Sequence, residues 1–162
     1  MKKKLLVAIC VPVLALAVSL ATPRGQAAAV GTDNVISAAG AGVFPAGANV
    51  NGIELAGGTF GVGVQSSSTG SAIGELEVQY NGTSIIGLSQ WITVSGWITS
   101  ATVNADGSVT LNGTSTLDMG DGTAPTGGLT LVATLGQTGL AVSVGSLTFP
   151  NLPKSDGWVF VE

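Results

Sequence analysis

Residues 74–82 read GELEVQYNG, and apolar and polar side chains alternate along them. A period of two residues is typical of a β-strand with one buried face, because successive side chains point to opposite sides of the strand. The side chains expected to face a core are those of Leu76, Val78 and Tyr80. Glu75 and Glu77, on the other side of the same strand, are expected to face water.

The same alternation recurs along the chain and is interrupted by turn signals. It is found in residues 59–64, 109–117, 129–135 and 140–149. Turns are predicted at Asn81-Gly82, at Asn104-Ala105-Asp106-Gly107 and at Gly136-Gln137-Thr138-Gly139. About nine or ten strands at a spacing of roughly 8–12 residues predict an all-β fold, either an antiparallel β-sandwich or a β-barrel.

Residues 1–29 have the organisation of a secretory signal peptide. Lys2, Lys3 and Lys4 precede an uncharged run over residues 5–21, and Ala27-Ala28-Ala29 supplies small residues for cleavage. The alternative is an uncleaved membrane anchor, but the run contains Pro12 and is shorter than the ~20 residues that a membrane-spanning helix needs. We therefore expect a protein that is exported, and that is secreted or held at the cell surface.

The mature chain is expected to consist of a short leading segment and one β-domain. Residues 30–49 are rich in Gly and Ala and are weakly patterned, which indicates a linker or an edge strand. Residues 50–162 are assigned to the β-domain. The last stretch, residues 158–162, reads WVFVE and is too apolar for a free tail, so we expect it to pair as a closing strand.

The charge balance excludes several classes of function. The chain holds five basic and nine acidic residues and no His, and Lys154 is the one base that follows the signal peptide. A mature chain with one base and nine acids has a formal charge of −8. Nucleic acids and anionic lipids are recognised by clustered Lys and Arg, so we expect no nucleic-acid partner and no membrane contact after signal cleavage.

The same composition argues against the common enzyme chemistries. Without His, the chain lacks imidazole bases and the His-dependent triads. Its single Cys is Cys10, within the signal peptide, so the mature protein is expected to have no disulfide and no thiol chemistry. We expect no cofactor, and we expect that the protein is not an enzyme.

Five segments also follow one another in an order known from a protein family. They are Gly57–Val64, Gly74–Asn81, Ile98–Val103, Val109–Ser115 and Leu129–Thr134. This order resembles that of post-COAP-1-type domains, which are β-rich modules of bacterial exported proteins. The turn GQTG at residues 136–139 departs from the acidic Asp/Gly/Pro turn of that family. The resemblance implies a β-fold and export, and it transfers no functional residue.

Glu75 and Glu77 are the closest pair of glutamates. At positions i and i+2 of a strand they share a face and lie ~6–7 Å apart. That separation suits the carboxylate pair of a glycosidase. Because glycosidase carboxylates normally come from different segments around a cleft, we favour a solvated outer face for both.

Two further groups of residues could bind ligands. Asp118 and Asp121 lie in the loop DMGDG and could bind calcium, although two carboxylates are few for an ion that takes six to eight oxygen ligands, and an ordinary turn is favoured. Aromatic side chains could form a surface for a carbohydrate or a small apolar molecule, or they could fill the core. The candidates are Trp91, Trp97, Trp158 and Tyr80.

The sequence therefore predicts a non-catalytic secreted or cell-surface β-domain with a structural or adhesive role. One alternative is a module that binds a carbohydrate or a small apolar ligand through the tryptophans. A second alternative is a hydrolase that uses carboxylates alone. The expected partners are cell-surface components or glycans, or a protein that the sequence does not identify.

Overall fold

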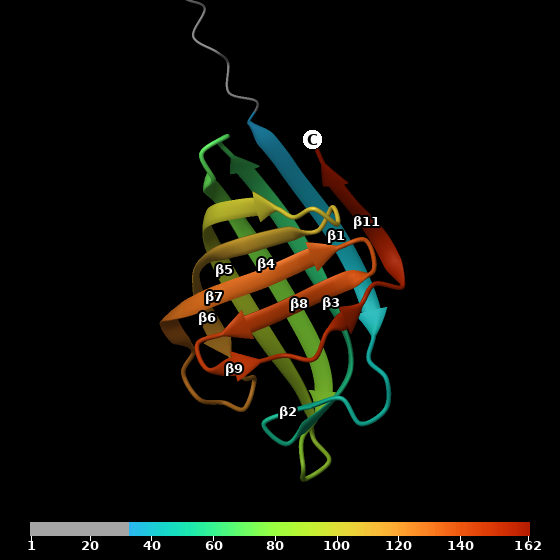
Figure 1. Cartoon of the computed structure of the whole chain (residues 1–162). Helices are drawn as coiled ribbons and strands as arrows, with labels where there is room; N and C mark the ends of the chain where they lie inside the picture. The colour runs from blue at the N-terminus through green and yellow to red at the C-terminus, as the bar shows by residue number, and fades with distance from the viewer. Residues whose placement is uncertain (1–32) are drawn as a thin grey trace, which may run out of the picture. The chain divides into compact units, whose positions relative to one another are not determined.

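The computed structural model describes residues 33–162, which form one antiparallel sheet of eleven strands (Figure 1). The strands are β1 (Asn34–Val43), β2 (Asn49–Val50), β3 (Ile53–Ser66), β4 (Ser71–Thr83), β5 (Ser89–Val103), β6 (Val109–Asp118), β7 (Thr126–Gly136), β8 (Gly139–Val144), β9 (Leu147–Thr148), β10 (Leu152–Pro153) and β11 (Asp156–Val161). The all-β prediction is confirmed, with eleven strands where the sequence indicated nine or ten. The predicted signal peptide lies outside the described residues. Within residues 33–162, no helix is long and apolar enough to cross a membrane.

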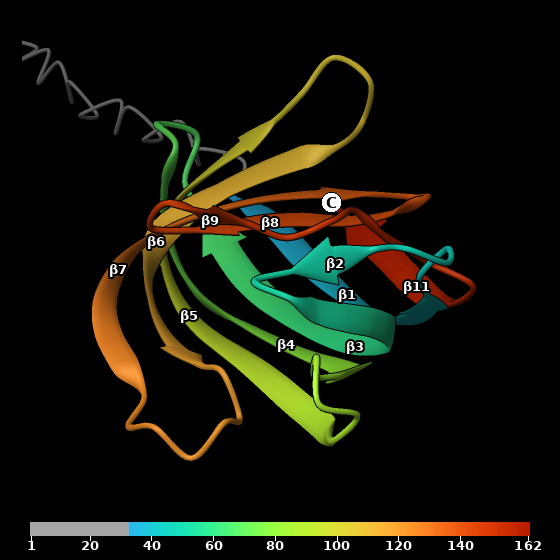
Figure 2. The ribbon, with the colours of Figure 1, turned by 90° about the horizontal axis from the view of Figure 1, so that it is seen from below.

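The sheet is a strongly curled half-barrel. Its strand order is β10-β8-β7-β6-β5-β4-β3-β1-β11, with β2 paired to β3 and β9 paired to β8. The strands from β3 to β8 form a meander, and the sheet curls so that β7 and β8 cross over β3, β4 and β5 (Figures 1 and 2). Bulges interrupt the β5–β6 ladder, between Ile98 and Ser100, and the β6–β7 ladder, between Ser115 and Leu117. A bulge bends its strand, which lets one sheet enclose a core.

The two ends of the strand order come together through the chain itself. β10 and β11 are separated only by Lys154 and Ser155, whose backbone N–H groups donate to Thr138 and Ala41 at 2.8 and 2.9 Å. These bonds tie the β8 side of the sheet to β1. The half-barrel is thereby fastened at one corner without a continuous ladder around it.

Residues 34–43, within the range expected to be a linker or an edge segment, form the internal strand β1. It pairs with β3 over its whole length and with β11 from Ile36 to Ala41. Val35 and Glu162 also exchange two backbone hydrogen bonds of 2.9 and 3.0 Å. The closing strand predicted near the C-terminus is confirmed as β11, and its partner is β1.

The inner face of the curl is an apolar core that includes Ile36, Phe60, Leu111, Leu131, Leu140 and Phe149. The phase predicted for β4 is confirmed, because Leu76, Val78 and Tyr80 are at most 1% exposed while Glu75 and Glu77 are exposed. Because successive side chains of a strand point to opposite faces, every second side chain of β3, β4 and β5 lies on the outer face of the sheet.

The hairpin turn predicted at Asn81-Gly82 lies elsewhere. Both residues stay within β4 and pair with β3 and β5, and the turn between β4 and β5 follows at residues 84–88. The predicted turns at residues 104–107 and 136–139 are confirmed, the first by a 2.7 Å bond from Asn104 N–H to the Ser108 carbonyl and the second by the β7–β8 connection.

Candidate functional site

The three tryptophans lie half-exposed on the outside of the domain. Trp91, Trp97 and Trp158 are 56%, 51% and 53% exposed. Tyr80, the fourth aromatic candidate from the sequence, is fully buried and its ring stacks on Phe149 with centroids 4.6 Å apart. Tyr80 therefore belongs to the core and does not share a ligand-binding surface with the tryptophans.

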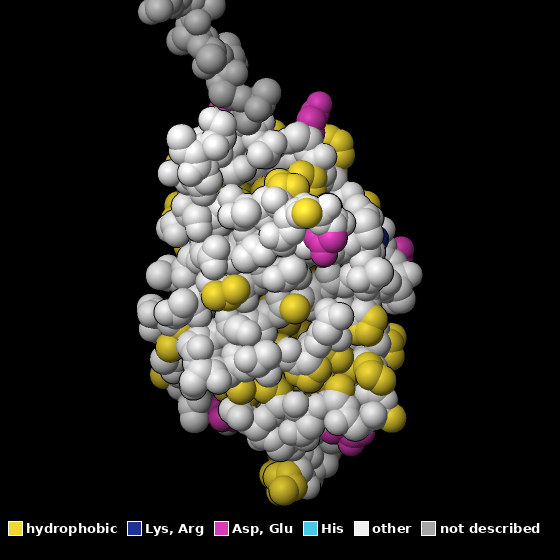
Figure 3. Space-filling model, viewed as in Figure 1, with side chains coloured by type: hydrophobic (Ala, Val, Ile, Leu, Met, Phe, Trp, Pro, Cys, Tyr) yellow, Lys and Arg dark blue, Asp and Glu magenta, His cyan; other side chains and the backbone are white. Residues whose placement is uncertain are grey.

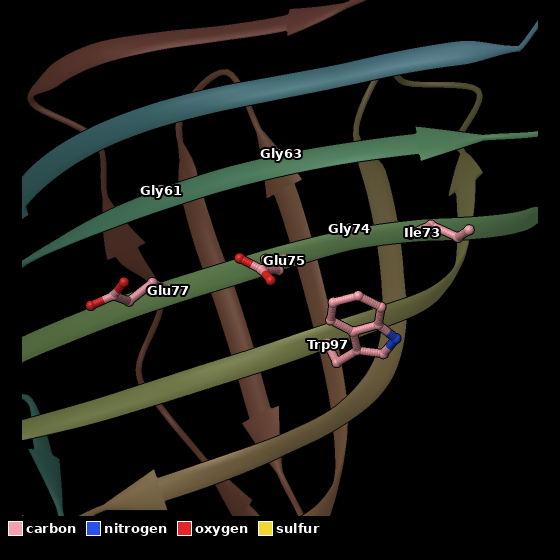
Figure 4. Close-up of a pocket in the computed structure, with 7 residues that line it drawn as sticks. All are labelled: Gly61, Gly63, Ile73, Gly74, Glu75, Glu77 and Trp97. Atoms are coloured by element: carbon pink, nitrogen blue, oxygen red, sulfur yellow. The ribbon is translucent and has the colours of Figure 1, made fainter.

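Trp97 shares the outer face of β3, β4 and β5 with the two glutamates. The ladder pairs Glu75 with Gly63 on one side and with Trp97 on the other, and it pairs Glu77 with Gly61. Directly paired residues project from the same face of a sheet. Together with Ile73 and Gly74 they line an open hollow of about 480 Å³, which we call the glycine hollow (Figure 4). In that view Gly61 and Gly63 lie on β3, next to the strand that carries the two carboxylates.

Packing does not require glycine at Gly61 or Gly63. A Cβ atom built on either residue meets no atom within 4 Å, and neither residue has a positive φ. At Gly74, by contrast, a Cβ would run into the backbone of β3. Glycine in a strand interior destabilises it by roughly 0.5–1 kcal/mol, and such a glycine often marks the close approach of a ligand. The two glycines therefore indicate a surface kept bare for something outside the fold.

The bare strip continues across β1 to two more aromatic side chains. Ser37 pairs with Gly63 and with Phe160, and Ala39 pairs with Gly61 and with Trp158. Phe160 is 48% exposed, close to the value of Trp158. Three strand spacings separate β11 from β4, or about 14 Å. The outer face thus presents a strip of small residues with Trp158 and Phe160 on one side and the glutamates and Trp97 on the other.

The two carboxylates of the glycine hollow are open to water. They stand at neighbouring outward positions of β4, and Figure 4 shows them side by side above the strand. No Lys or Arg is among the residues that line the hollow. The site can therefore accept hydrogen bonds from hydroxyl or amine groups, and it offers an indole face beside them.

The candidate calcium ligands serve their own loop. Asp118 accepts a hydrogen bond from the Gly120 N–H at 2.8 Å. Asp121 accepts hydrogen bonds from the hydroxyl and the N–H of Thr123 at 2.6 and 2.9 Å. Both bonds lower the pKa of Asp121, and the bond from the hydroxyl has the larger effect. Residues 33–162 contain no group of three or more His, Cys, Asp or Glu that could hold a metal ion. The loop has the geometry of an ordinary Asp/Gly turn.

No family model, no curated protein and no solved structure matches the chain. The resemblance to post-COAP-1-type domains stays a prediction. The candidate site is therefore identified from the geometry of the structure alone. Sequence reasoning missed Gly61, Gly63 and Phe160 as parts of the site. The available signal was the pair of glycines at alternate, outward positions of a strand whose inward positions are Phe60, Val62 and Val64.

Proposed function

We propose that this protein is a non-catalytic adhesive domain that acts outside the cell and binds a neutral polysaccharide through the glycine hollow. The observation that carries the proposal is the bare strip at Gly61 and Gly63, which lies between exposed aromatic side chains on both sides. An extended polymer needs a long, shallow track without protruding side chains. The outer face of β11, β1, β3, β4 and β5 provides such a track.

The chemistry of the surface supports a sugar. The apolar C–H face of a pyranose ring packs against an indole, which is large, rigid and polar only at its N–H. The carboxylates of Glu75 and Glu77 can accept hydrogen bonds from sugar hydroxyls, and charge-assisted bonds of this kind are stronger than neutral ones. The described residues hold nine acids and one Lys, so a polyanionic glycan would be repelled.

The arrangement of the glutamates supports binding over hydrolysis. Inverting glycosidases hold their carboxyl groups ~6.5–9.5 Å apart on opposite sides of the scissile bond. Positions i and i+2 of a strand are ~6–7 Å apart, but Glu75 and Glu77 both project from the same strand into open solvent. A polysaccharide on this face would lie over the pair and not between its members.

Affinity electrophoresis through gels that contain neutral or anionic polysaccharides tests the proposal. We expect that a neutral polysaccharide retards the protein, and that Trp97→Ala weakens binding by about tenfold, equivalent to ~1.4 kcal/mol. Gly63→Thr is expected to abolish retardation, because the threonine side chain blocks the strip. The same substitution is expected to raise the free energy of unfolding by up to ~1 kcal/mol, because threonine has the higher β propensity. Trp91→Ala, outside the hollow, is the matched control and is expected to bind normally.

Three results would argue against the proposal. Failure of every neutral polysaccharide to retard the protein would remove its support. Unfolding of the Gly63→Thr variant would mean that the glycine has a structural role. Release of reducing sugar from a bound polysaccharide would favour the carboxylate-only hydrolase instead.

A further inference from the structure

The turn between β4 and β5 carries three aliphatic side chains into solvent. Ile85, Ile86 and Leu88 are 90%, 76% and 62% exposed, and we call them the apolar tip. Figure 1 places this turn at one pole of the domain, and Figure 3 shows hydrophobic side chains projecting there beyond the rest of the surface. No other turn of the described residues exposes three large aliphatic side chains.

The conformation of the turn is fixed by its own hydrogen bonds. The Ser84 N–H donates to the Leu88 carbonyl at 2.8 Å, and the Gly87 N–H donates to the Ser84 carbonyl at 2.8 Å. The Leu88 N–H also donates to the Ser84 hydroxyl at 3.1 Å. This closed turn holds the aliphatic side chains outward, because the short loop has no length with which to fold back over the core.

The half-exposed indole of Trp91 lies three residues behind Leu88 on the same hairpin. At the rise of a β-strand, three residues correspond to about 10 Å. Tryptophan is enriched at the headgroup level of membranes, and peripheral elements bury their apolar parts about 5–10 Å into that boundary. The spacing of Trp91 behind the apolar tip matches this depth.

We propose that the apolar tip inserts into the surface of a zwitterionic lipid layer and anchors the domain there reversibly. The tip is convex, and residues 78–105 carry no charge. A fluid apolar layer can accept such a tip, whereas a protein partner would need a groove of matching shape. The charges next to the tip are acidic. Glu54 pairs with Thr83, and Asp121 lines the same small hollow as Ile85. An anionic lipid surface would therefore repel the tip.

The apolar tip would bring the domain into contact with a membrane, whereas the charge balance predicted no membrane contact after signal cleavage. That expectation excluded attachment through clustered basic residues, which the apolar tip does not use. Three aliphatic side chains bury less apolar area than a single myristoyl chain, which itself gives only marginal and reversible binding. The attachment is weak for one molecule and independent of the glycine hollow.

Vesicle flotation tests the tip. The full chain and, in parallel, the compact unit Gly31–Glu162 are mixed with phosphatidylcholine vesicles, with or without anionic phosphatidylglycerol. With lipid in large excess, we expect a measurable fraction of each to float with phosphatidylcholine alone, with little dependence on salt. The double variant Ile85→Ser/Ile86→Ser is expected to lower the binding of Gly31–Glu162 by at least about tenfold. Val103→Ser removes an exposed aliphatic side chain, 44% exposed, at the end of β5 away from the tip, and is the matched control.

A second readout localises the contact. In a Trp97→Phe/Trp158→Phe background, brominated acyl chains should quench the fluorescence of Trp91, and the double tip variant should abolish the quenching in either form of the chain. Thermal unfolding checks that the variants fold, and Leu88→Ser serves where the double variant does not. Binding that requires anionic lipid would overturn the proposal. So would binding that survives loss of the tip, or the absence of binding by Gly31–Glu162.

Discussion

Val78 and Glu77 are neighbours in β4 that face opposite sides of the sheet. Val78 is fully buried and Glu77 is exposed. Val78→Asp puts an unpaired carboxylate into the core at a cost of several kcal/mol, out of a total of about 5–15 kcal/mol for a domain. We expect this variant to lose the cooperative transition in urea followed by tryptophan fluorescence. Glu77→Lys should change the free energy of unfolding by about 0.5 kcal/mol. The opposite ranking would mean that the strand phase is inverted.

Tyr80 has a buried hydroxyl with no hydrogen-bond partner among the described residues. Its ring packs between Phe149 and Phe44, with centroid distances of 4.6 and 5.8 Å. Leaving a buried hydroxyl unpaired costs about 1–3 kcal/mol. The ring therefore contributes to the core, while the hydroxyl weakens it.

Burial raises the pKa of the Tyr80 phenol, and this makes the stability of the fold depend on pH in the alkaline range. Above pH ~10 the unfolded chain loses the phenol proton while the folded protein keeps it, so stability falls as pH rises. We expect Tyr80→Phe to raise the free energy of unfolding by about 1 kcal/mol at neutral pH, and by more above pH ~10. Urea unfolding measures both values. Tyr80 is the single tyrosine, so the absence of phenolate absorbance in the folded protein checks the cause, and early ionisation would contradict it.

At the scale of the strands, the β4–β5 hairpin shows how far a local signal reaches. Asn81-Gly82 is typical of a two-residue turn, yet β4 continues because β3 and β5 both supply partners beyond it. Gly82 instead permits close packing, since a Cβ there would lie 2.6 Å from the Glu54 carbonyl oxygen. The turn forms where Ser84 supplies hydrogen bonds and Gly87 supplies a φ of +80°. Pairing with the neighbouring strands, which the local sequence does not specify, determines that the turn forms at Gly87 and not at Gly82.

The contact between β1 and β10 depends on Gly42. A Cβ at this position would overlap the backbone carbonyl of Pro153 and approach Leu152. We expect Gly42→Ala to destabilise the domain by about 1–3 kcal/mol, the usual cost of overpacking. Gly61→Ala, in open space on β3, is the control and should leave stability unchanged or raise it by about 0.5–1 kcal/mol. Thermal unfolding of the two variants makes the comparison, and equal melting temperatures would contradict it.

At the scale of the whole molecule, alternation in the sequence predicts strands but not their distant partners. The phases of β3, β4 and β8 could be read locally, because one face of each is buried. The pairing of Ile36 with Val161 has no local signal, and neither does the curl that joins all strands into one sheet. The site follows the same division. Trp97 and Trp158 were candidates from the sequence, but only the register across β11, β1, β3, β4 and β5 places the glycines between them.

The two hydrogen bonds between Val35 and Glu162 bring Asp33 and Glu162 to the same corner of the domain. Tension applied between these residues pulls β1 and β11 apart from one end, so their bonds break one after another and never share the load. Such a seam opens at low force and lengthens the chain by the span of β11, while the ladders from β3 to β8 stay unloaded. Under a sudden pull on the domain, the β1–β11 pair would thus separate before any other ladder, and the two strands would pair again when the pull ends.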